Sequence, residues 1–208
     1  MVASPAMSTR VVCVSRAAGA GGEDIGRLLA ERLGYRYLDE EIVSLAAERG
    51  GFDREAVADT EERKTLVWRV LAQLASTTPE ADLGGVRAEP ERHRELIRDV
   101  IREVAEEGEA VIVAHAASHA LAGRDGVLRV LVTASPEARA RRLAVSRGID
   151  ETEAAKALRS EDAARADYLK RFYGVERELP EQYDLVLNTE TLPPQRAAAV
   201  IASAVARD

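Results

Sequence analysis

The residues best placed for chemistry are three glycines, Gly19, Gly21 and Gly22, which crowd into four positions of the chain. An apolar, mostly β-branched run at 11–14 precedes them, and a segment with helical periodicity at 23–33 follows them. A buried strand that passes through small residues into a helix N-terminus presents several backbone N–H groups in one concavity, which suits phosphate. The pattern therefore predicts a phosphate-binding loop. Glycine is also common in a plain connection between strand and helix, and spacing alone leaves both interpretations open.

The loop departs from the phosphate-binding pattern G-x-x-x-x-G-K-[ST], which places a lysine after the last glycine. Gly22 stands at the position of that lysine, and Glu23 and Asp24 follow it. The backbone cradle is kept, whereas the lysine and the magnesium-binding hydroxyl are missing. Arg16 is the nearby cation in the sequence that could replace the lysine. The two acids are more simply explained as first-turn residues, because the helix dipole favours negative charge there.

Basic residues gather in the second half of the chain. Residues 124–171 hold 11 Arg or Lys against 8 Asp or Glu, in a chain whose net charge is −7. The overall charge argues against a general nucleic-acid binder, while a local excess of arginine suits a small polyanion. For most of these arginines, a solvated helical surface with i,i+4 ion pairs is the simpler explanation.

Alternating apolar periodicities predict the elements that must position these residues. Such alternation is typical of an α/β fold, here a five-stranded parallel sheet with helices on both faces. Ligands of these sheets bind at the carboxyl ends of the strands, where the glycine loop falls. The expected strands are 11–14, 35–38, 110–114, 127–133 and 184–188. The expected helices after the first are 39–50, 53–73, 91–107, 136–146, 151–173 and 193–207, with a turn-rich segment at 76–90.

One domain accounts for the chain from residue 10 to residue 208, after a tail at 1–9 that we expect to be disordered. A nearly all-helical block at 39–107 separates the second strand from the third, which is the natural place for an inserted subdomain that covers a substrate. No apolar run approaches the roughly 18 residues of a membrane span, and the opening residues lack a secretory signal. The single cysteine, Cys13, is expected to be buried in the first strand and fits a reducing, cytoplasmic location.

Two histidines, His115 and His119, are four residues apart and would share one face of a helix. Zn²⁺ sites require three or four protein ligands, and no cysteine or third histidine lies near this pair in the sequence. We therefore favour a structural role and predict no metal site.

Five segments of the chain, taken together in their order and spacing, indicate a protein family. They are 11–26 (VVCVSRAAGAGGEDIG), 37–39 (YLD), 131–143 (LVTASPEARARRL), 160–174 (SEDAARADYLKRFYG) and 183–189 (YDLVLNT). Together they resemble the cytidylate kinase-like family, which belongs to the P-loop nucleoside monophosphate kinases. The resemblance covers nearly the whole chain and is weakest over 61–89, and it implies a P-loop kinase fold.

The resemblance also implies how the ATP donor would be held. Gly19, Gly21 and Gly22 would lie in the loop that contacts its phosphates, and from their positions we expect Arg16 and Ala20 to contribute there as well. A helix and a lid region, at about 146–172, would close over the donor phosphates with Arg139, Arg142 and Arg147.

On the acceptor side, the resemblance places Asp39 in the nucleotide-binding region after the second strand, although a lone aspartate there is also a good helix N-cap. The third strand of the family should end in a Gly-Arg pair that grips the acceptor, and here Ala114 and His115 stand in its place. His115 would bind phosphate only when protonated, and with a reference pKa of about 6.5 it is mostly neutral at pH 7.

Catalysis is expected from Asp162 and Arg165, which match the D-x-x-R motif of cytidylate kinases, together with Arg159. Phosphoryl transfer spreads negative charge over the transferred group, which arginines and Mg²⁺ can stabilise. The alternative for Asp162 and Arg165 is an exposed ion pair three residues apart on a helix, worth about 0.2–0.5 kcal/mol.

The sequence thus predicts a kinase that uses ATP and Mg²⁺ and transfers phosphate to a nucleoside monophosphate, with CMP or dCMP first. Two alternatives stay open: a catalytically degenerate nucleotide-binding or regulatory protein of the same fold, and a kinase for another small-molecule acceptor. The expected partners are nucleotide substrates, without nucleic acid or membrane. Nothing in the sequence fixes the oligomeric state.

Overall fold

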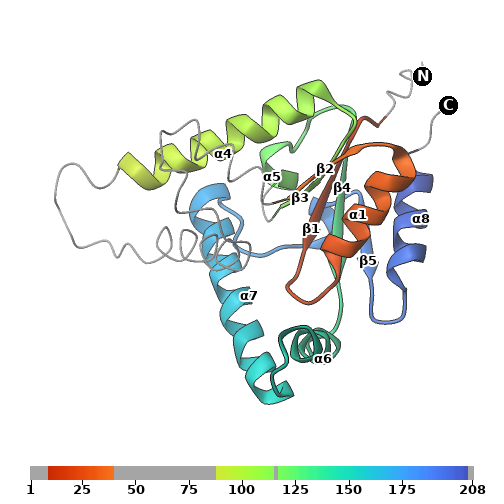
Figure 1. The fold of residues 1–208 in the computed structure, drawn as a ribbon. Coiled ribbons are helices and arrows are strands. Elements are labelled where there is room, and N and C mark those ends of the chain that lie inside the picture. Colours follow the sequence, from red (N-terminus) through yellow and green to blue (C-terminus); the bar gives the residue numbers. More distant parts are fainter. Residues whose placement is uncertain (1–8, 40–87, 115–116, 206–208) are drawn as a thin grey trace, which may run out of the picture.

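The computed structural model describes residues 9–39, 88–114 and 117–205, in which strands and helices alternate (Figure 1). The strands are β1 (Val11–Arg16), β2 (Arg36–Leu38), β3 (Ala110–Val113), β4 (Val127–Thr133) and β5 (Leu185–Asn188). The helices are α1 (Gly22–Leu33), α4 (Ala88–Glu107), α5 (Ala117–Ala120), α6 (Pro136–Arg147), α7 (Glu151–Tyr173) and α8 (Pro194–Ala204), with a 3-10 turn, η2 (Pro180–Gln182), before β5.

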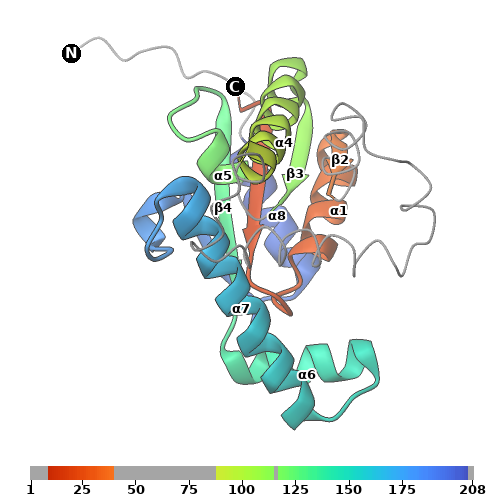
Figure 2. The same ribbon diagram turned by 90° about the vertical axis from the view of Figure 1, so that its left-hand side faces the viewer.

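The strands form one sheet in the order β2-β3-β1-β4-β5, and every neighbouring pair is parallel. Helices cover both faces: α1 and α8 lie on one, and α4 and α5 on the other (Figures 1 and 2). The central strand β1 contributes Val12 and Val14 to the first core and Val11 and Cys13 to the second. Because both faces of β1 are buried, its sequence is a continuous apolar run. The expected five-stranded parallel sheet is confirmed.

Helices α6 and α7 form a hairpin that extends beyond the carboxyl ends of the strands (Figures 1 and 2). Ser135 caps α6 by accepting a hydrogen bond of 3.2 Å, and Pro136 occupies the first turn, as the sequence predicts. Gly148, with φ of 65°, ends α6, and Asp150 then caps α7 through two hydrogen bonds of 2.8 Å. The two helices pack through Ala140, Leu143, Ala144, Ala154 and Leu158.

Most element bounds agree with the sequence to within two or three residues. β1 is longer than expected, because Ser15 and Arg16 continue the ladder with β4. α5 forms inside a stretch, 115–126, for which no helix was expected, and α4 begins at Ala88, inside the segment expected to be turn-rich. Pro90 does not prevent this, because the first turn of a helix tolerates proline. The helices expected at 39–50 and 53–73 lie outside the described residues.

The C-terminal half of α4 packs directly on the sheet. Val100, Ile101 and Val104 are buried in the same core as Val11 and Ile112 of the strands. This end of the proposed 39–107 insert is therefore fixed to the main body, whereas residues 40–87 lie outside the described part.

Cys13 is fully buried, as expected, and burial raises the pKa of its thiol to about 12. The thiol stays protonated at neutral pH and serves as a small apolar side chain. Within the described ranges, no helix combines the length and apolarity needed to cross a membrane.

Candidate functional site

The glycine loop connects the carboxyl end of β1 to α1 through two left-handed residues. Gly19 has φ of 72° and Gly21 has φ of 80°, conformations that other residues adopt only at a cost. A Cβ on Gly19 would also lie 2.7 Å from the carbonyl oxygen of Arg139. Gly21 is the N-cap of α1 and provides no side-chain cap, so the first-turn N–H groups can bind a ligand.

The outer side of this loop is fixed by a contact from the end of β5. The hydroxyl of Thr189 donates to the carbonyl of Ala20 at 2.8 Å and accepts from Arg142 at 3.0 Å. Arg142 also donates to the Thr189 carbonyl and, at 3.5 Å, to the Gly19 carbonyl. Arg142 thus connects Thr189 to the Gly19 carbonyl of the loop, while its relation to a donor phosphate stays a prediction.

Arg16, the last residue of β1, lies across the start of α1. Its guanidinium is 2.7 Å from the carboxylate of Glu23 and 3.9 Å from that of Asp39. Asp39 also accepts a hydrogen bond of 3.0 Å from the hydroxyl of Tyr37. Burial raises the pKa of Asp39, and the charge of Arg16 and this hydrogen bond only partly offset it.

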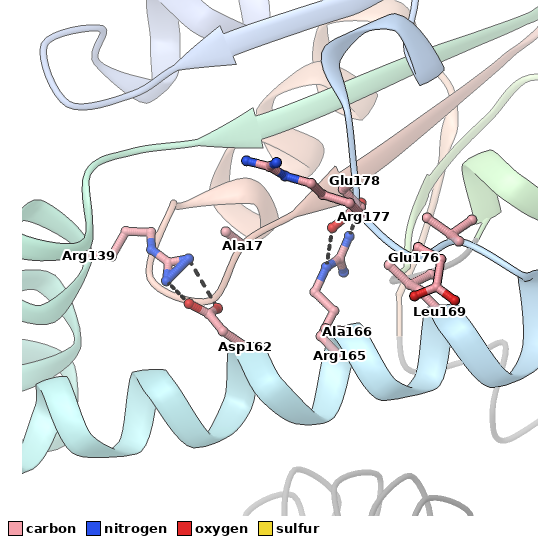
Figure 3. A pocket seen from close by; sticks show the side chains of 10 residues that line it. Ala17, Arg139, Asp162, Arg165, Ala166, Leu169, Glu176, Arg177 and Glu178 are labelled. Atoms are coloured by element: carbon pink, nitrogen blue, oxygen red, sulfur yellow. Dashed lines mark hydrogen bonds and ion pairs between the residues drawn. The ribbon is translucent and has the colours of Figure 1, made fainter.

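A cavity of about 210 Å³ opens beside the loop, between α7 and the segment that follows it (Figure 3). Arg139 of α6 faces it and makes two hydrogen bonds to Asp162 of α7, one of them 3.1 Å long. Burial raises the pKa of Asp162 despite the charges of Arg139 and Arg165. The polar lining of the cavity is Arg139, Asp162, Arg165, Glu176, Arg177 and Glu178.

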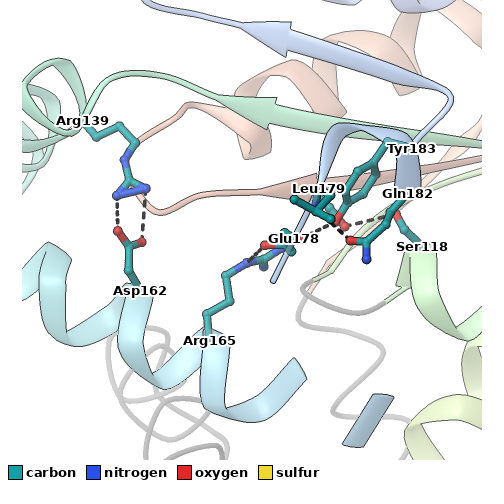
Figure 4. A network of polar contacts seen from close by, with 9 residues as sticks. Ser118, Arg139, Asp162, Arg165, Glu178, Leu179, Gln182 and Tyr183 are labelled. Atoms are coloured by element: carbon teal, nitrogen blue, oxygen red, sulfur yellow. Dashed lines mark hydrogen bonds and ion pairs between the residues drawn. The ribbon is translucent and has the colours of Figure 1, made fainter. Parts of the chain in front are cut away.

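The opposite end of the cavity is closed by a chain of polar contacts (Figure 4). Arg165 of α7 makes two hydrogen bonds, of 2.8 and 2.7 Å, to the carboxylate of Glu178, and the hydroxyl of Tyr183 donates to the same carboxylate. Ser15, near the end of β1, lies beside Tyr183, and its hydroxyl is 3.1 Å from that of Ser118. Burial alone would raise the pKa of Glu178, but its partners outweigh burial and lower it.

These contacts argue against the alternative in which Asp162 and Arg165 form an exposed ion pair with each other along the helix. Only 7% of the Arg165 side chain is exposed, and its salt bridge is with Glu178. Asp162 is bound to Arg139, 23 positions away in the sequence. Both residues face the cavity because they lie one turn apart on the inner side of α7.

Of the predicted site residues, the structure gathers Arg16, Asp39, Arg139, Asp162 and Arg165 near the glycine loop. Arg147 instead lies at the end of α6 and pairs with Glu161 of α7 at 2.7 Å, and Arg159 is exposed on α7. His115 lies outside the described residues.

Sequence reasoning missed Glu178, Tyr183, Arg177 and Thr189 as site residues. Tyr183 and Thr189 lie within the segment 183–189 that carries the family resemblance, so that segment offered a signal for them. Glu178 and Arg177 lie in an irregular stretch without periodicity and offered none.

His119 is packed between the rings of Tyr173 and Tyr183, at centroid distances of 5.9 and 6.0 Å. Burial lowers the pKa of His119, so it is neutral at pH 7. Among the residues that the structure describes, no group of three or more His, Cys, Asp or Glu side chains could hold a metal ion.

Comparisons with known proteins agree with this architecture. An 18% identical protein of unknown function from Eubacterium ventriosum superposes with a TM-score of 0.68 over 95% of this chain and 98% of its own. A 16% identical shikimate kinase from Bacteroides thetaiotaomicron superposes with a TM-score of 0.55 over 94% and 97%. At these identities the likeness establishes the fold, that of the P-loop-type kinases.

The sequence comparisons are more specific. The family model of the cytidylate kinase-like family matches residues 11–191, and the chain belongs to that family. A cytidylate kinase from Methanocorpusculum labreanum is 28% identical over 93% of this chain and 95% of its own length. One from Mycobacterium leprae is 31% identical over 65% and 68%. This kinship supports a kinase acting on a nucleotide or another small molecule.

Proposed function

We propose that this protein is a nucleoside monophosphate kinase that transfers the γ-phosphate of ATP, with Mg²⁺, to CMP or dCMP. The main support for the proposal is the loop between β1 and α1. Two left-handed glycines and the contacts of Thr189 fix its shape, and the first N–H groups of α1 have no side-chain cap. Backbone groups arranged in this way bind phosphate without a reorganisation cost. The relatives named cytidylate kinase support the choice of acceptor.

The cavity beside the loop supports the catalytic half of the proposal. Arg139 and Arg165 enter it from two helices, next to Ala17 of the loop. Transfer between two phosphates needs positive charge on both sides of the moving group, and planar guanidinium groups bind phosphate oxygens in pairs. In this proposal Arg139 contacts the donor side, and Asp162 and Arg165 contact the acceptor phosphate. Asp39, at the carboxyl end of β2, contacts the acceptor nucleotide.

The residues near the loop fit a magnesium ion that arrives with ATP. Mg²⁺ prefers oxygen ligands, keeps several waters and is often bound by one or two carboxylates plus substrate phosphates. The carboxylate of Glu23 lies beside the loop and would hold the ion. Bound there, Mg²⁺ would neutralise charge that develops on the phosphates.

The direct test is ADP release from ATP–Mg²⁺ with CMP, dCMP, UMP, AMP, GMP, a set of small non-nucleotide alcohols, or no acceptor. We expect acceptor-dependent ADP with CMP or dCMP. Turnover with a different small-molecule acceptor alone would favour that alternative. ATP binding without any turnover would favour a degenerate nucleotide-binding protein. This is the second candidate because glycine replaces the phosphate-loop lysine at position 22.

A variant pair tests the loop itself. Gly21→Val should abolish the rise in melting temperature that ATP causes by mass action. Gly34→Val is the matched control: Gly34 lies at the other end of α1, its φ of 69° resembles the 80° of Gly21, and an added Cβ meets nothing within 4 Å at either position. Both changes should therefore cost a similar 1–2 kcal/mol or so of backbone strain. If ATP still protects Gly21→Val as well as it protects Gly34→Val, the loop assignment is wrong.

A further inference from the structure

Gly22 has no conformational reason to be glycine. Its φ is not among the positive values of the described glycines, and it is the first residue of the regular helix α1. Glycine is also a poor helix former, by about 1 kcal/mol relative to alanine in a helix interior. The reason for glycine must therefore lie in what surrounds it.

The side chain of Arg16 fills the space beside Gly22. A Cβ added to Gly22 would lie 2.6 Å from Cβ and 2.7 Å from Cδ of Arg16, distances that real Cβ atoms do not show. The Cβ of Arg16 is fixed to the backbone of a paired strand and cannot swing aside. Any side chain at position 22, including the lysine of the common phosphate-loop pattern, is thus incompatible with Arg16 as it lies here.

The guanidinium of Arg16 has a hydrogen-bonding capacity that the described residues do not satisfy. Only 15% of this side chain is exposed, and its Nε is buried without a hydrogen-bond partner among them. A buried donor without a partner costs about 1–3 kcal/mol, so a ligand that supplies an oxygen there binds more tightly. The partners that Arg16 has are carboxylates, Glu23 and Asp39, which are anions as phosphate is.

We propose that Arg16 and Gly22 are an exchanged pair: Arg16 supplies the phosphate-binding cation of the loop, and Gly22 is glycine to make room for it. In the pattern G-x-x-x-x-G-K-[ST] the first glycine falls on position 16 and the lysine on position 22, so here the cation and the glycine have changed places. Glu23 holds Arg16 when no phosphate is bound and gives it up to the ligand. This assignment deepens the proposed function and rests on it.

The test measures the affinity of the purified chain for ATP and for inorganic tripolyphosphate by calorimetry, without turnover. Arg16→Ala should weaken both at least about tenfold, since hydrogen bonds to charged groups contribute about 1.5–3 kcal/mol. Arg16→Gln keeps the stem of the side chain and should weaken binding similarly if loss of the charge is the cause. Arg27→Ala removes an exposed arginine of α1 near the loop, and we expect its affinities to stay within about twofold of wild type.

The exchange itself gives the sharper result. Gly22→Lys alone should weaken tripolyphosphate binding, because the lysine stem and Arg16 compete for one space. The double variant R16G/G22K restores the common pattern and should bind within a few-fold of wild type. If Gly22→Lys alone binds as tightly as wild type, or if Arg16→Ala and Arg16→Gln lose nothing, the exchange is overturned.

The outcomes separate this inference from the proposed function. If the wild-type chain binds ATP through Arg16 but phosphorylates no acceptor, the exchange of Arg16 and Gly22 is supported and the proposed kinase activity is wrong. If the wild-type chain is active and Arg16→Ala binds ATP and tripolyphosphate as tightly as wild type, only the proposed exchange is wrong. Failure of the wild type to bind either ATP or tripolyphosphate removes both.

Discussion

Two arginine–carboxylate pairs face the same cavity and differ in what surrounds the carboxylate. Arg139 and Arg165 are equally buried, each with 7% of its side chain exposed. Asp162, the partner of Arg139, is 43% exposed and its pKa is raised. Glu178, the partner of Arg165, is 21% exposed, receives a further hydrogen bond from Tyr183, and its pKa is lowered.

The difference indicates which pair can open for a ligand. A lowered pKa means that the folded protein stabilises the charged carboxylate of Glu178, whereas a raised pKa means that it disfavours the charge of Asp162. Glu178 also accepts three hydrogen bonds and is less exposed, whereas Asp162 accepts two from Arg139 and is more exposed, so Arg165 and Glu178 are held more firmly and Arg139 and Asp162 separate more easily. Of the two arginines, Arg139 is better suited to exchange its carboxylate for a phosphate group.

The largest expected effect comes from breaking the more firmly held pair. Arg165→Ala leaves the half-buried carboxylate of Glu178 without its cation, which should cost about 3 kcal/mol of stability. In a chain of this length, that corresponds to a fall of about 6–12 °C in melting temperature. The sequence alone favours almost no change, because an exposed i,i+3 ion pair contributes so little.

Two controls belong to this measurement. Arg171→Ala removes a more exposed arginine of the same helix, paired with Asp167 at 3.0 Å, and should lower stability by no more than about 0.5 kcal/mol. The double variant R165A/E178Q also removes the carboxylate that Arg165→Ala leaves without a cation, and it should recover part of the lost stability. An Arg165→Ala protein as stable as Arg171→Ala would contradict the distinction between the two cavity pairs.

A smaller effect distinguishes the pairs by the sign of their pH dependence. The lowered pKa of Glu178 means that its stabilisation is complete above its unfolded pKa of about 4.3 and is lost as pH falls through the folded value. The destabilisation of Glu178→Gln should therefore shrink toward acid. For Asp162 the raised pKa reverses the sign: stability is lost as pH rises from about 3.9 through the folded value.

Asp162→Asn should accordingly lose less stability than Glu178→Gln at pH 7, although each variant leaves its arginine without a charged partner, and only the loss of Glu178→Gln should shrink below about pH 4. Melting temperatures of wild type, Glu178→Gln and Asp162→Asn between pH 3 and pH 7 provide the check. Parallel curves for the two variants would show that the carboxylates do not differ in the way described.

The sequence predicted the sheet and the glycine loop because both depend on local patterns. Val11–Val14 is apolar for its whole length since β1 is buried on both faces, and the glycines lie where the backbone turns. The partners of Arg139 and Arg165 could not be predicted, because they lie 23 and 13 positions away and meet only through the fold. The contact between Arg16 and Gly22 likewise depends on how the loop returns over the strand end.

The smallest expected effect concerns how far the polar contacts of Glu178 and Tyr183 extend into the protein. Ser118 lies beyond Ser15, fully buried and 3.1 Å from the hydroxyl of Ser15, which in turn lies beside Tyr183. Ser118→Ala should cost about 1 kcal/mol, the usual net contribution of a buried hydrogen bond. If the hydroxyls polarise one another along the chain to Glu178, this cost should shrink in a Tyr183→Phe background, which interrupts it. Equal costs in both backgrounds, measured by chemical denaturation, would place the end of the network at Tyr183 and leave Ser15 and Ser118 as a separate pair.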